Sequence, residues 1–89
     1  MKTFNDLQFK EHPKGAVYGG IISRIIFDNG YGASIVKGPY SYGGADGLYE
    51  LAVIGKDDKI CYDTPVTSDI EGYLSEEQVT DLLIKIQQL

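Results

Sequence analysis

The longest β-favouring run of the chain is Gly20-Ile-Ile-Ser-Arg-Ile-Ile-Phe-Asp-Asn-Gly-Tyr-Gly-Ala-Ser-Ile-Val-Lys37, with Asn29-Gly30 in its middle. A pair of this type between β-branched segments is the strongest local signal for a hairpin, because Asn and Gly tolerate the positive φ angles of a type I′ turn. The sequence therefore predicts a hairpin in which Asp28 faces Tyr31, Phe27 faces Gly32, Ile25 faces Ser34 and Ser23 faces Val36.

The segments on either side of this hairpin have weaker patterns. In residues 1–16, Phe4, Leu7 and Phe9 are expected to anchor a short edge strand or turn, which His12-Pro13-Lys14-Gly15 ends. On the other side, residues 38–47 contain four glycines and a proline. This composition favours neither strand nor helix and predicts a flexible loop that carries Tyr40 and Tyr42.

Two further strands are predicted after the loop. Leu48–Ile54 reads as a third strand and Ile60–Thr64 as a fourth, which Pro65 stops. The polar turn between them is short, so these strands should be antiparallel neighbours. Ser68-Asp-Ile-Glu71 has the spacing of a capping box and predicts one short helical turn that Gly72 ends.

The C-terminal segment predicts a helix. Ser75-Glu-Glu-Gln78 is a second capping box, in which the Ser75 side chain accepts from the Gln78 amide and the Gln78 side chain reaches back. Apolar residues then recur at the i, i+3, i+4, i+7 spacing of an amphipathic helix: Val79, Leu82, Leu83, Ile86 and Leu89.

These elements predict an α+β fold: an antiparallel meander sheet of four to five strands with one C-terminal amphipathic helix on one face. Ile21, Ile25 and Phe27 point to one face of the sheet, while the other face is also apolar. One helix of about 13 residues spans about 20 Å and cannot cover both faces. The N-terminal segment, curling of the sheet, a second copy or a foreign partner must cover the rest. We favour a homodimer or a partner, with Ile21, Ile25 and Phe27 at the interface.

The 89 residues are expected to form a single domain, residues 1–89. No apolar run approaches the roughly 18 residues of a membrane span, and the N-terminus has no secretory signal. The one cysteine, Cys61, cannot form an internal disulfide. A reducing cytoplasm is therefore the expected compartment.

The net charge of −5 is unevenly distributed along the sequence. Residues 57–81 hold only one basic side chain, Lys59, against a block of acidic ones: Asp57, Asp58, Asp63, Asp69, Glu71, Glu76, Glu77 and Asp81. Such a block argues against direct binding of nucleic acid and suits a basic partner, although a solubilising acidic face is the simpler interpretation.

Motifs for catalysis and for metal or cofactor binding are not evident. His12 and Cys61 are the sole residues of their types, and nothing local pairs them as base and nucleophile. His12 reads as a surface turn residue and Cys61 as a small buried side chain. One His and one Cys cannot form a structural zinc site, and the carboxylates lack the spacing of a calcium loop. We expect a non-enzymatic protein with no cofactor and no metal.

Three segments together resemble a group of small uncharacterised phage-encoded proteins. They are Phe27-Asp-Asn-Gly-Tyr-Gly-Ala-Ser-Ile-Val36, Tyr49-Glu-Leu-Ala-Val53, and Cys61-Tyr-Asp-Thr-Pro-Val-Thr-Ser-Asp-Ile-Glu-Gly-Tyr-Leu74 followed by a short helix. The likeness covers nearly the whole chain and carries no enzymatic signature. It implies an accessory protein of the anti-defence type, such as an anti-CRISPR inhibitor, acting in the cytoplasm of the host cell.

The leading hypothesis is therefore an inhibitor that binds a basic host defence or nucleic-acid-processing protein. Its contact residues would be the two loop tyrosines and part of the acidic block: Tyr40, Tyr42, Asp57, Asp58, Asp63, Asp69 and Glu71. The alternative is sequestration of a small nucleotide-type signalling molecule in a tyrosine-lined pocket between subunits, with Arg24, Lys37 or His12 holding phosphate. A purely structural or assembly module is a third possibility.

Overall fold

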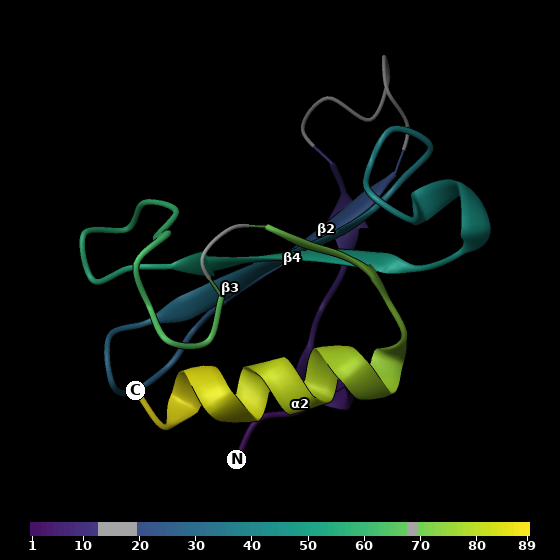
Figure 1. The fold of residues 1–89 in the computed structure, drawn as a ribbon. Helices are drawn as coiled ribbons and strands as arrows, with labels where there is room; N and C mark the ends of the chain where they lie inside the picture. Colours follow the sequence, from purple (N-terminus) through teal and green to yellow (C-terminus); the bar gives the residue numbers. More distant parts are fainter. Residues whose placement is uncertain (13–19, 68–69) are drawn as a thin grey trace.

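The computed structural model describes residues 1–12, 20–67 and 70–89, and its described elements form one antiparallel sheet with a helix against it (Figure 1). The strands follow the order β1-β2-β3-β4-β5, so each pairs with its neighbour in sequence. The predicted α+β meander is confirmed. The elements are η1 (Phe4–Asp6), β1 (Lys10–Glu11), β2 (Ile21–Ile26), β3 (Gly32–Lys37), η2 (Gly44–Asp46), β4 (Tyr49–Ile54), β5 (Glu71–Leu74) and α2 (Glu76–Gln87).

The central hairpin forms as predicted, but its register is wrong by one residue. Ile26 pairs with Gly32 and Ser23 with Ile35. The Phe27 amide donates to the Tyr31 carbonyl at 2.7 Å, which leaves a three-residue loop, and Gly30 alone in that loop has a positive φ, 89°. This is a turn followed by a left-handed glycine in place of the expected type I′ turn.

The predicted fourth strand is also wrong. Ile60 makes one isolated bridge to Ile54, and the Cys61 amide donates to the Val53 carbonyl at 2.8 Å. Beyond that point the chain leaves the sheet, and the Thr64 hydroxyl bonds the Thr67 backbone in a bend around Pro65. β3 lies along one edge of β4, and the strand that pairs with its other edge is β5.

The helical turn predicted at Ser68–Glu71 falls partly outside the described residues, since Ser68 and Asp69 are not among them. Glu71 is the first residue of β5 and Gly72 lies within it, so neither belongs to a helical turn. The pairing of β5 with β4 is irregular between Tyr49 and Leu51.

The helix prediction is confirmed. Both halves of the capping box form: the Gln78 amide donates to Ser75 Oγ at 3.2 Å, and the Ser75 amide donates to Gln78 Oε1 at 2.9 Å. Glu76 and Glu77 lie in the first turn and Lys85 in the last, where each charge complements the helix dipole. Val79, Leu83 and Ile86 are buried against the sheet.

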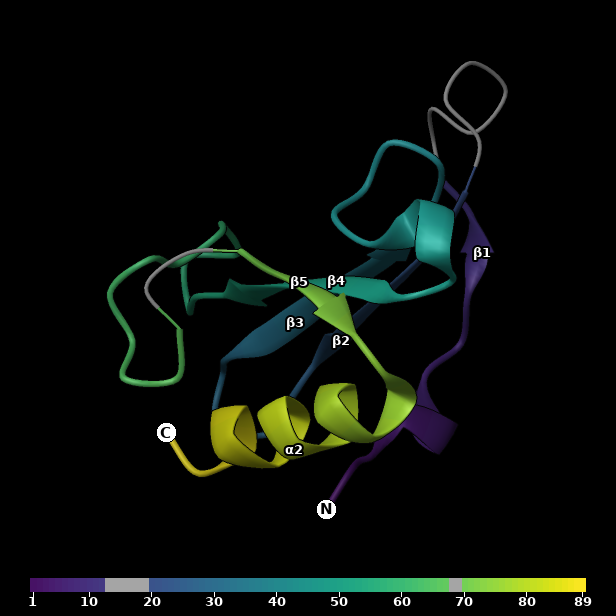
Figure 2. The same ribbon diagram turned by 45° about the vertical axis from the view of Figure 1, so that its right-hand side comes forward.

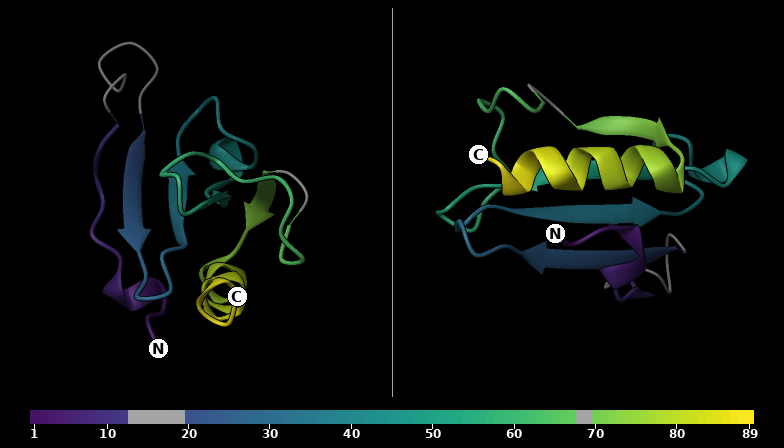
Figure 3. Two further views of the ribbon diagram at one scale, coloured as in Figure 1. Left: turned by 90° about the vertical axis from the view of Figure 1, so that its left-hand side faces the viewer. Right: turned by 90° about the horizontal axis from the view of Figure 1, so that it is seen from below.

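One face of the sheet, the helix face, holds the core. Figure 3 shows α2 and η1 side by side below the sheet, with η1 nearer to β2. Ala33 and Ile35 of β3 and Leu51 and Val53 of β4 are buried beneath α2. The N-terminal segment, one of the four candidates for covering the second face, packs on the helix face instead, and the Phe4 ring lies edge-on to Tyr49 at 5.1 Å between centroids.

The opposite face, which we call the open face, lies on the side of the sheet away from α2 (Figure 2). Alternation along the paired strands places these residues on it: Lys10, Ile22, Arg24, Ile26, Gly32, Ser34, Val36, Glu50, Ala52, Ile54 and Ile60. Ile26 is 53% exposed and Ile60 43% exposed, whereas Gly32, Ala52 and Ile54 are buried.

The proposed interface residues Ile21, Ile25 and Phe27 alternate onto the helix face instead. Phe27 is buried in the core, and Ile25 packs against it there. These two side chains are therefore occupied within the chain, and the aliphatic side chains of the sheet that remain largely exposed, Ile26 and Ile60, lie on the open face.

Candidate functional site

Two of the tyrosines singled out from the sequence lie on a loop that is held by its own hydrogen bonds. Ser41 Oγ accepts from the Gly38 amide and donates to the Gly38 carbonyl, both at 3.0 Å. The Leu48 amide donates to the Gly43 carbonyl at 2.9 Å and closes the loop. The glycine-rich composition of residues 38–47 suggested a flexible loop. These contacts fix its path.

The same loop is joined to β4 and β5. The Tyr42 amide donates to Glu50 Oε1 at 3.1 Å, and the Tyr73 amide donates to the Tyr42 carbonyl at 3.1 Å. A Cβ on Gly72 would lie 2.3 Å from the Tyr42 Cβ. Glycine at position 72 is thus required for the loop to lie against β5.

Three exposed tyrosines lie on this loop and on the strand that is joined to it, and we call them the tyrosine surface: Tyr40 at 79% exposure, Tyr42 at 62% and Tyr73 at 61%. The sequence indicated the first two. Tyr73 was missed, because its place beside Tyr42 depends on the pairing of β5 with β4, and residues 71–74 carry a weak strand pattern.

Tyr73 also has an unusual backbone conformation. Its φ is 56°, in the left-handed region that bulky L-residues avoid. A conformation of this kind costs on the order of 1 kcal/mol and persists only where the surroundings impose it. Here the bond from the Tyr73 amide to the Tyr42 carbonyl contributes to that restraint.

Acidic side chains accompany the tyrosine surface. Asp46 lies on η2 of the same loop and is exposed, and Glu71 is exposed at the start of β5. Glu50 accepts from the Tyr42 amide. Lys37 is nearby in sequence but lies over the Tyr49 ring, 5.0 Å from its centroid, which places it towards the helix face.

The remaining acidic candidates do not join this surface. Asp57 and Asp58 follow the C-terminal end of β4, whereas the tyrosine loop precedes its N-terminal end. A six-residue strand separates them by about 20 Å. Figure 1 shows the two connections at opposite ends of β4. Asp63 follows Asp58 on the same side of the molecule, and Asp69 lies outside the described residues.

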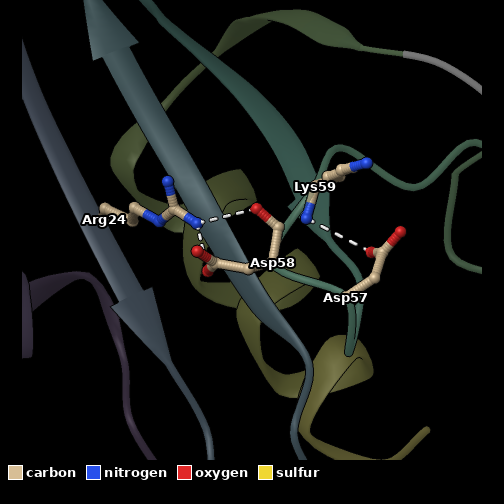
Figure 4. A network of polar contacts seen from close by, with 4 residues as sticks. All are labelled: Arg24, Asp57, Asp58 and Lys59. Atoms are coloured by element: carbon tan, nitrogen blue, oxygen red, sulfur yellow. Dashed lines mark hydrogen bonds and ion pairs between the residues drawn. The ribbon is translucent and has the colours of Figure 1, made fainter.

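Asp58 is already paired within the chain. Arg24 Nη2 donates to the Asp58 carboxylate and, at 3.1 Å, to the Asp58 carbonyl (Figure 4). The Asp57 carboxylate accepts from the Lys59 amide at 3.2 Å. The structure thus divides the predicted contact residues into an acidic tyrosine surface and a charge-compensated turn.

Arg24, Lys37 and His12, the predicted phosphate ligands, do not converge within one chain. Arg24 lies on the open face, and Lys37 lies over Tyr49 towards the helix face. A pocket of about 330 Å³ lies where the termini meet, and another of about 310 Å³ lies between β5 and α2. No tyrosine lines either of these two pockets.

Cys61 and His12 lie at opposite ends of the sheet. The His12 amide donates to the Gly20 carbonyl, near the start of β2, while Cys61 bonds Val53 near the end of β4. Cys61 Sγ donates to Asp63 Oδ1 at 2.9 Å, and this hydrogen bond raises the pKa of the thiol above 9.0. A thiol held protonated in this way is a poor nucleophile at neutral pH.

Searches among protein-family models, curated proteins and solved structures give no match to this chain. Within the described residues, no helix combines the length and the apolar character needed to cross a membrane.

Proposed function

We propose that the chain is a non-enzymatic inhibitor of the phage anti-defence type, which binds a basic host protein through the tyrosine surface. In this proposal it acts in the cytoplasm of the host cell, on a CRISPR or other nucleic-acid-processing complex. The observation that carries the proposal is the exposure of three tyrosines on the loop and the strand joined to it, Tyr40, Tyr42 and Tyr73, with exposed carboxylates on the same two segments.

Exposed tyrosines held by a rigid backbone are well suited to protein recognition. A tyrosine offers a large, amphipathic contact area while losing few rotatable bonds on binding. The loop at residues 38–47 is hydrogen-bonded before any partner arrives, so little backbone entropy is lost when the complex forms.

The charge near the surface favours a basic partner. Asp46 and Glu71 supply exposed carboxylates, and the tyrosine rings offer faces on which Arg or Lys side chains can stack. With a net charge of −5, the chain would be steered towards a nucleic-acid-binding groove rich in Lys and Arg. Inhibition would follow from occupying that groove, with no chemical step.

The experiment is a plaque assay in bacteria that carry one defence system, beginning with CRISPR–Cas. Expression of the chain should raise plating efficiency only in the presence of the defence system. Tyr73→Asn should abolish the effect, because Asn tolerates the left-handed φ and removes only the aromatic ring. Glu71→Lys should weaken binding of the purified complex and lower its sensitivity to salt.

The matched control is Asp57→Lys, which makes the same change of charge at the far end of β4. Retention of the effect in this variant, with loss in Tyr73→Asn and Glu71→Lys, would support the tyrosine surface. Unchanged plating across a panel of defence systems would contradict the proposed function. Loss with Asp57→Lys alone would assign binding to the opposite end of the sheet.

A further inference from the structure

The loop of the central hairpin is bonded to the C-terminal end of α2 through the side chain of Asn29 (Figure 1). Asn29 Nδ2 donates to the Ile86 carbonyl at 2.9 Å and to the Leu89 main-chain oxygen at 3.5 Å. Asn29 Oδ1 accepts from the Tyr31 amide at 3.0 Å. Carbonyls of a last helical turn lack donors within the helix, so the hairpin supplies one to α2.

The same asparagine precedes Gly30, and Asn-Gly is the pair in which asparagine deamidates most readily. The Gly30 nitrogen attacks Asn29 Cγ and forms a cyclic imide, while the Cγ–Nδ2 bond breaks and ammonia leaves with the Gly30 amide proton. Water then opens either of the two imide C–N bonds and gives Asp or isoAsp at position 29. Glycine favours the first step because it has no Cβ to obstruct the attacking nitrogen.

The folded chain holds each group that this reaction uses. The Gly30 amide donates to the Phe27 carbonyl at 3.0 Å, so the attacking nitrogen is engaged elsewhere. The Ile86 carbonyl holds the leaving group, Nδ2. Attack on Cγ therefore requires the side chain to leave the helix end and the loop to open. Because helix termini open at a lower cost than the core, release of the last turn of α2 is the easiest route.

We propose that Asn29-Gly30 is a deamidation site that is controlled by the last turn of α2, and that the completed reaction frees this turn from the hairpin. The product has a carboxylate in place of the amide, so it offers no donor to the Ile86 carbonyl. Its charge also faces the negative end of the helix dipole. The change is irreversible, because ammonia is lost to the solvent.

A second contact on the same end of α2 provides a way to loosen it without altering the hairpin. Gln87 Oε1 accepts from the Lys2 amide, and Gln87 Nε2 donates to the Lys2 carbonyl, both at 2.8 Å. The matched control is Gln78, which has the same side chain but lies in the first turn of α2, in the capping box.

The test follows Asn29 by peptide mapping and mass spectrometry in mildly alkaline buffer. Deamidation should be at least about tenfold slower in the folded wild type than in the chain unfolded by urea. Gln87→Ala should speed it about threefold or more in the folded chain, because two hydrogen bonds to Lys2 are lost. Gln78→Ala should leave the rate near that of the wild type. Asn5, the other asparagine, precedes Asp6 and serves as a slowly reacting internal reference.

The effect of the product is measured with Asn29→Asp, which has its charge, and Asn29→Ala, which only lacks the amide. Amide hydrogen exchange in the last turn of α2 should be about tenfold faster in Asn29→Asp than in the wild type, with Asn29→Ala between them. Val79, near the other end of α2, should exchange alike in all three. Circular dichroism checks that the variants fold.

Equal deamidation rates in the folded and the unfolded chain would overturn the proposal, because the helix end would then give no protection. Absence of deamidation in urea would do the same. Equal acceleration by Gln87→Ala and Gln78→Ala would place the reaction in the globally unfolded chain and remove control by the last turn. Wild-type exchange in Asn29→Asp would show that the product does not free the helix end. These readouts do not depend on whether the chain has the proposed function.

Discussion

The two faces of the sheet have similar apolar patterns in the sequence but differ in how far their side chains are buried. On the helix face, Leu51, Ile35 and the α2 residues Leu83 and Ile86 lose all contact with solvent. On the open face, Ile26 and Ile60 keep about half of theirs. The difference comes from the covering elements: α2 and the N-terminal segment both lie on the same side. Apolar alternation indicates that a face needs cover, and long-range packing decides which face the chain covers itself.

The largest expected loss of stability comes from a substitution in the core of the helix face. Leu83→Ala should lower the free energy of unfolding by about 2–5 kcal/mol, because it removes a fully buried side chain and leaves a cavity. Ile26→Ala on the open face should change it by only about 0.5 kcal/mol in a dilute, monomeric sample. Urea unfolding of both variants measures this difference. Equal losses would mean that the open face is packed as tightly as the core.

A smaller effect concerns the loop that rests against one end of the sheet. Gly72→Ala should cost about 1–3 kcal/mol, because the new Cβ would meet the Tyr42 Cβ at 2.3 Å and force the backbones apart. At Gly47, which has a φ of 78° and open space around it, an alanine should cost only about 1 kcal/mol from backbone strain. Urea unfolding measures both changes. If Gly72→Ala is no worse than Gly47→Ala, the loop is not held against β5.

The helix cap gives a third comparison. Ser75→Ala should lower the free energy of unfolding by about 1 kcal/mol, because the Gln78 amide loses its acceptor at the start of α2. Ser34→Ala removes the same hydroxyl from the open face and should have a smaller effect. Thermal unfolding of the two variants measures the difference. A larger loss at Ser34 would contradict the assignment of Ser75 as the cap.

Sequence and structure agree best where local rules suffice. The helix rests on a capping box and an apolar period, and both are local. The hairpin was placed correctly, but its register was not, and the hairpin loop makes a contact with a residue that is distant in the sequence. Asn29 Oδ1 accepts from the Tyr31 amide, and Asn29 Nδ2 donates to the Ile86 carbonyl at 2.9 Å, near the end of α2. The Asn-Gly pair does not reveal that the Asn side chain bonds the helix end.

The candidate site shows the same limit. Tyr40 and Tyr42 were indicated by a loop rich in glycine, which is a local signal. Tyr73 joined them only through β5, a four-residue strand with a glycine and a left-handed residue inside it. The strand propensity of residues 71–74 is weaker than that of Ile60–Thr64, so the sequence favoured a strand at Ile60–Thr64. In the structure, that segment makes a single bridge to β4.

The smallest expected effect concerns the hydrogen bond of the Cys61 thiol, at the point where the chain passes from the open face to the helix face. Ile60 lies on the open face, and the next residue, Cys61, packs against the core of the helix face. The Asp63 carboxylate accepts a hydrogen bond from the Cys61 thiol, which raises the pKa of Cys61 above its ordinary value of 9.0. Because the folded pKa is the higher one, this contribution to stability is present below pH 9.0 and is lost as the pH rises through the folded pKa.

Asp63→Ala should therefore move the midpoint of iodoacetamide reactivity towards pH 9.0 and speed alkylation at pH values near it. Asp57→Ala, on the preceding turn, should shift the midpoint far less, because its carboxylate acts on the thiol only through space. Rates of alkylation across the pH series, measured by mass spectrometry, compare the two. Equal shifts would mean that general negative charge sets the thiol pKa. A dominant shift for Asp63→Ala would show that the Cys61–Asp63 hydrogen bond persists in solution where the chain passes from the open face to the core.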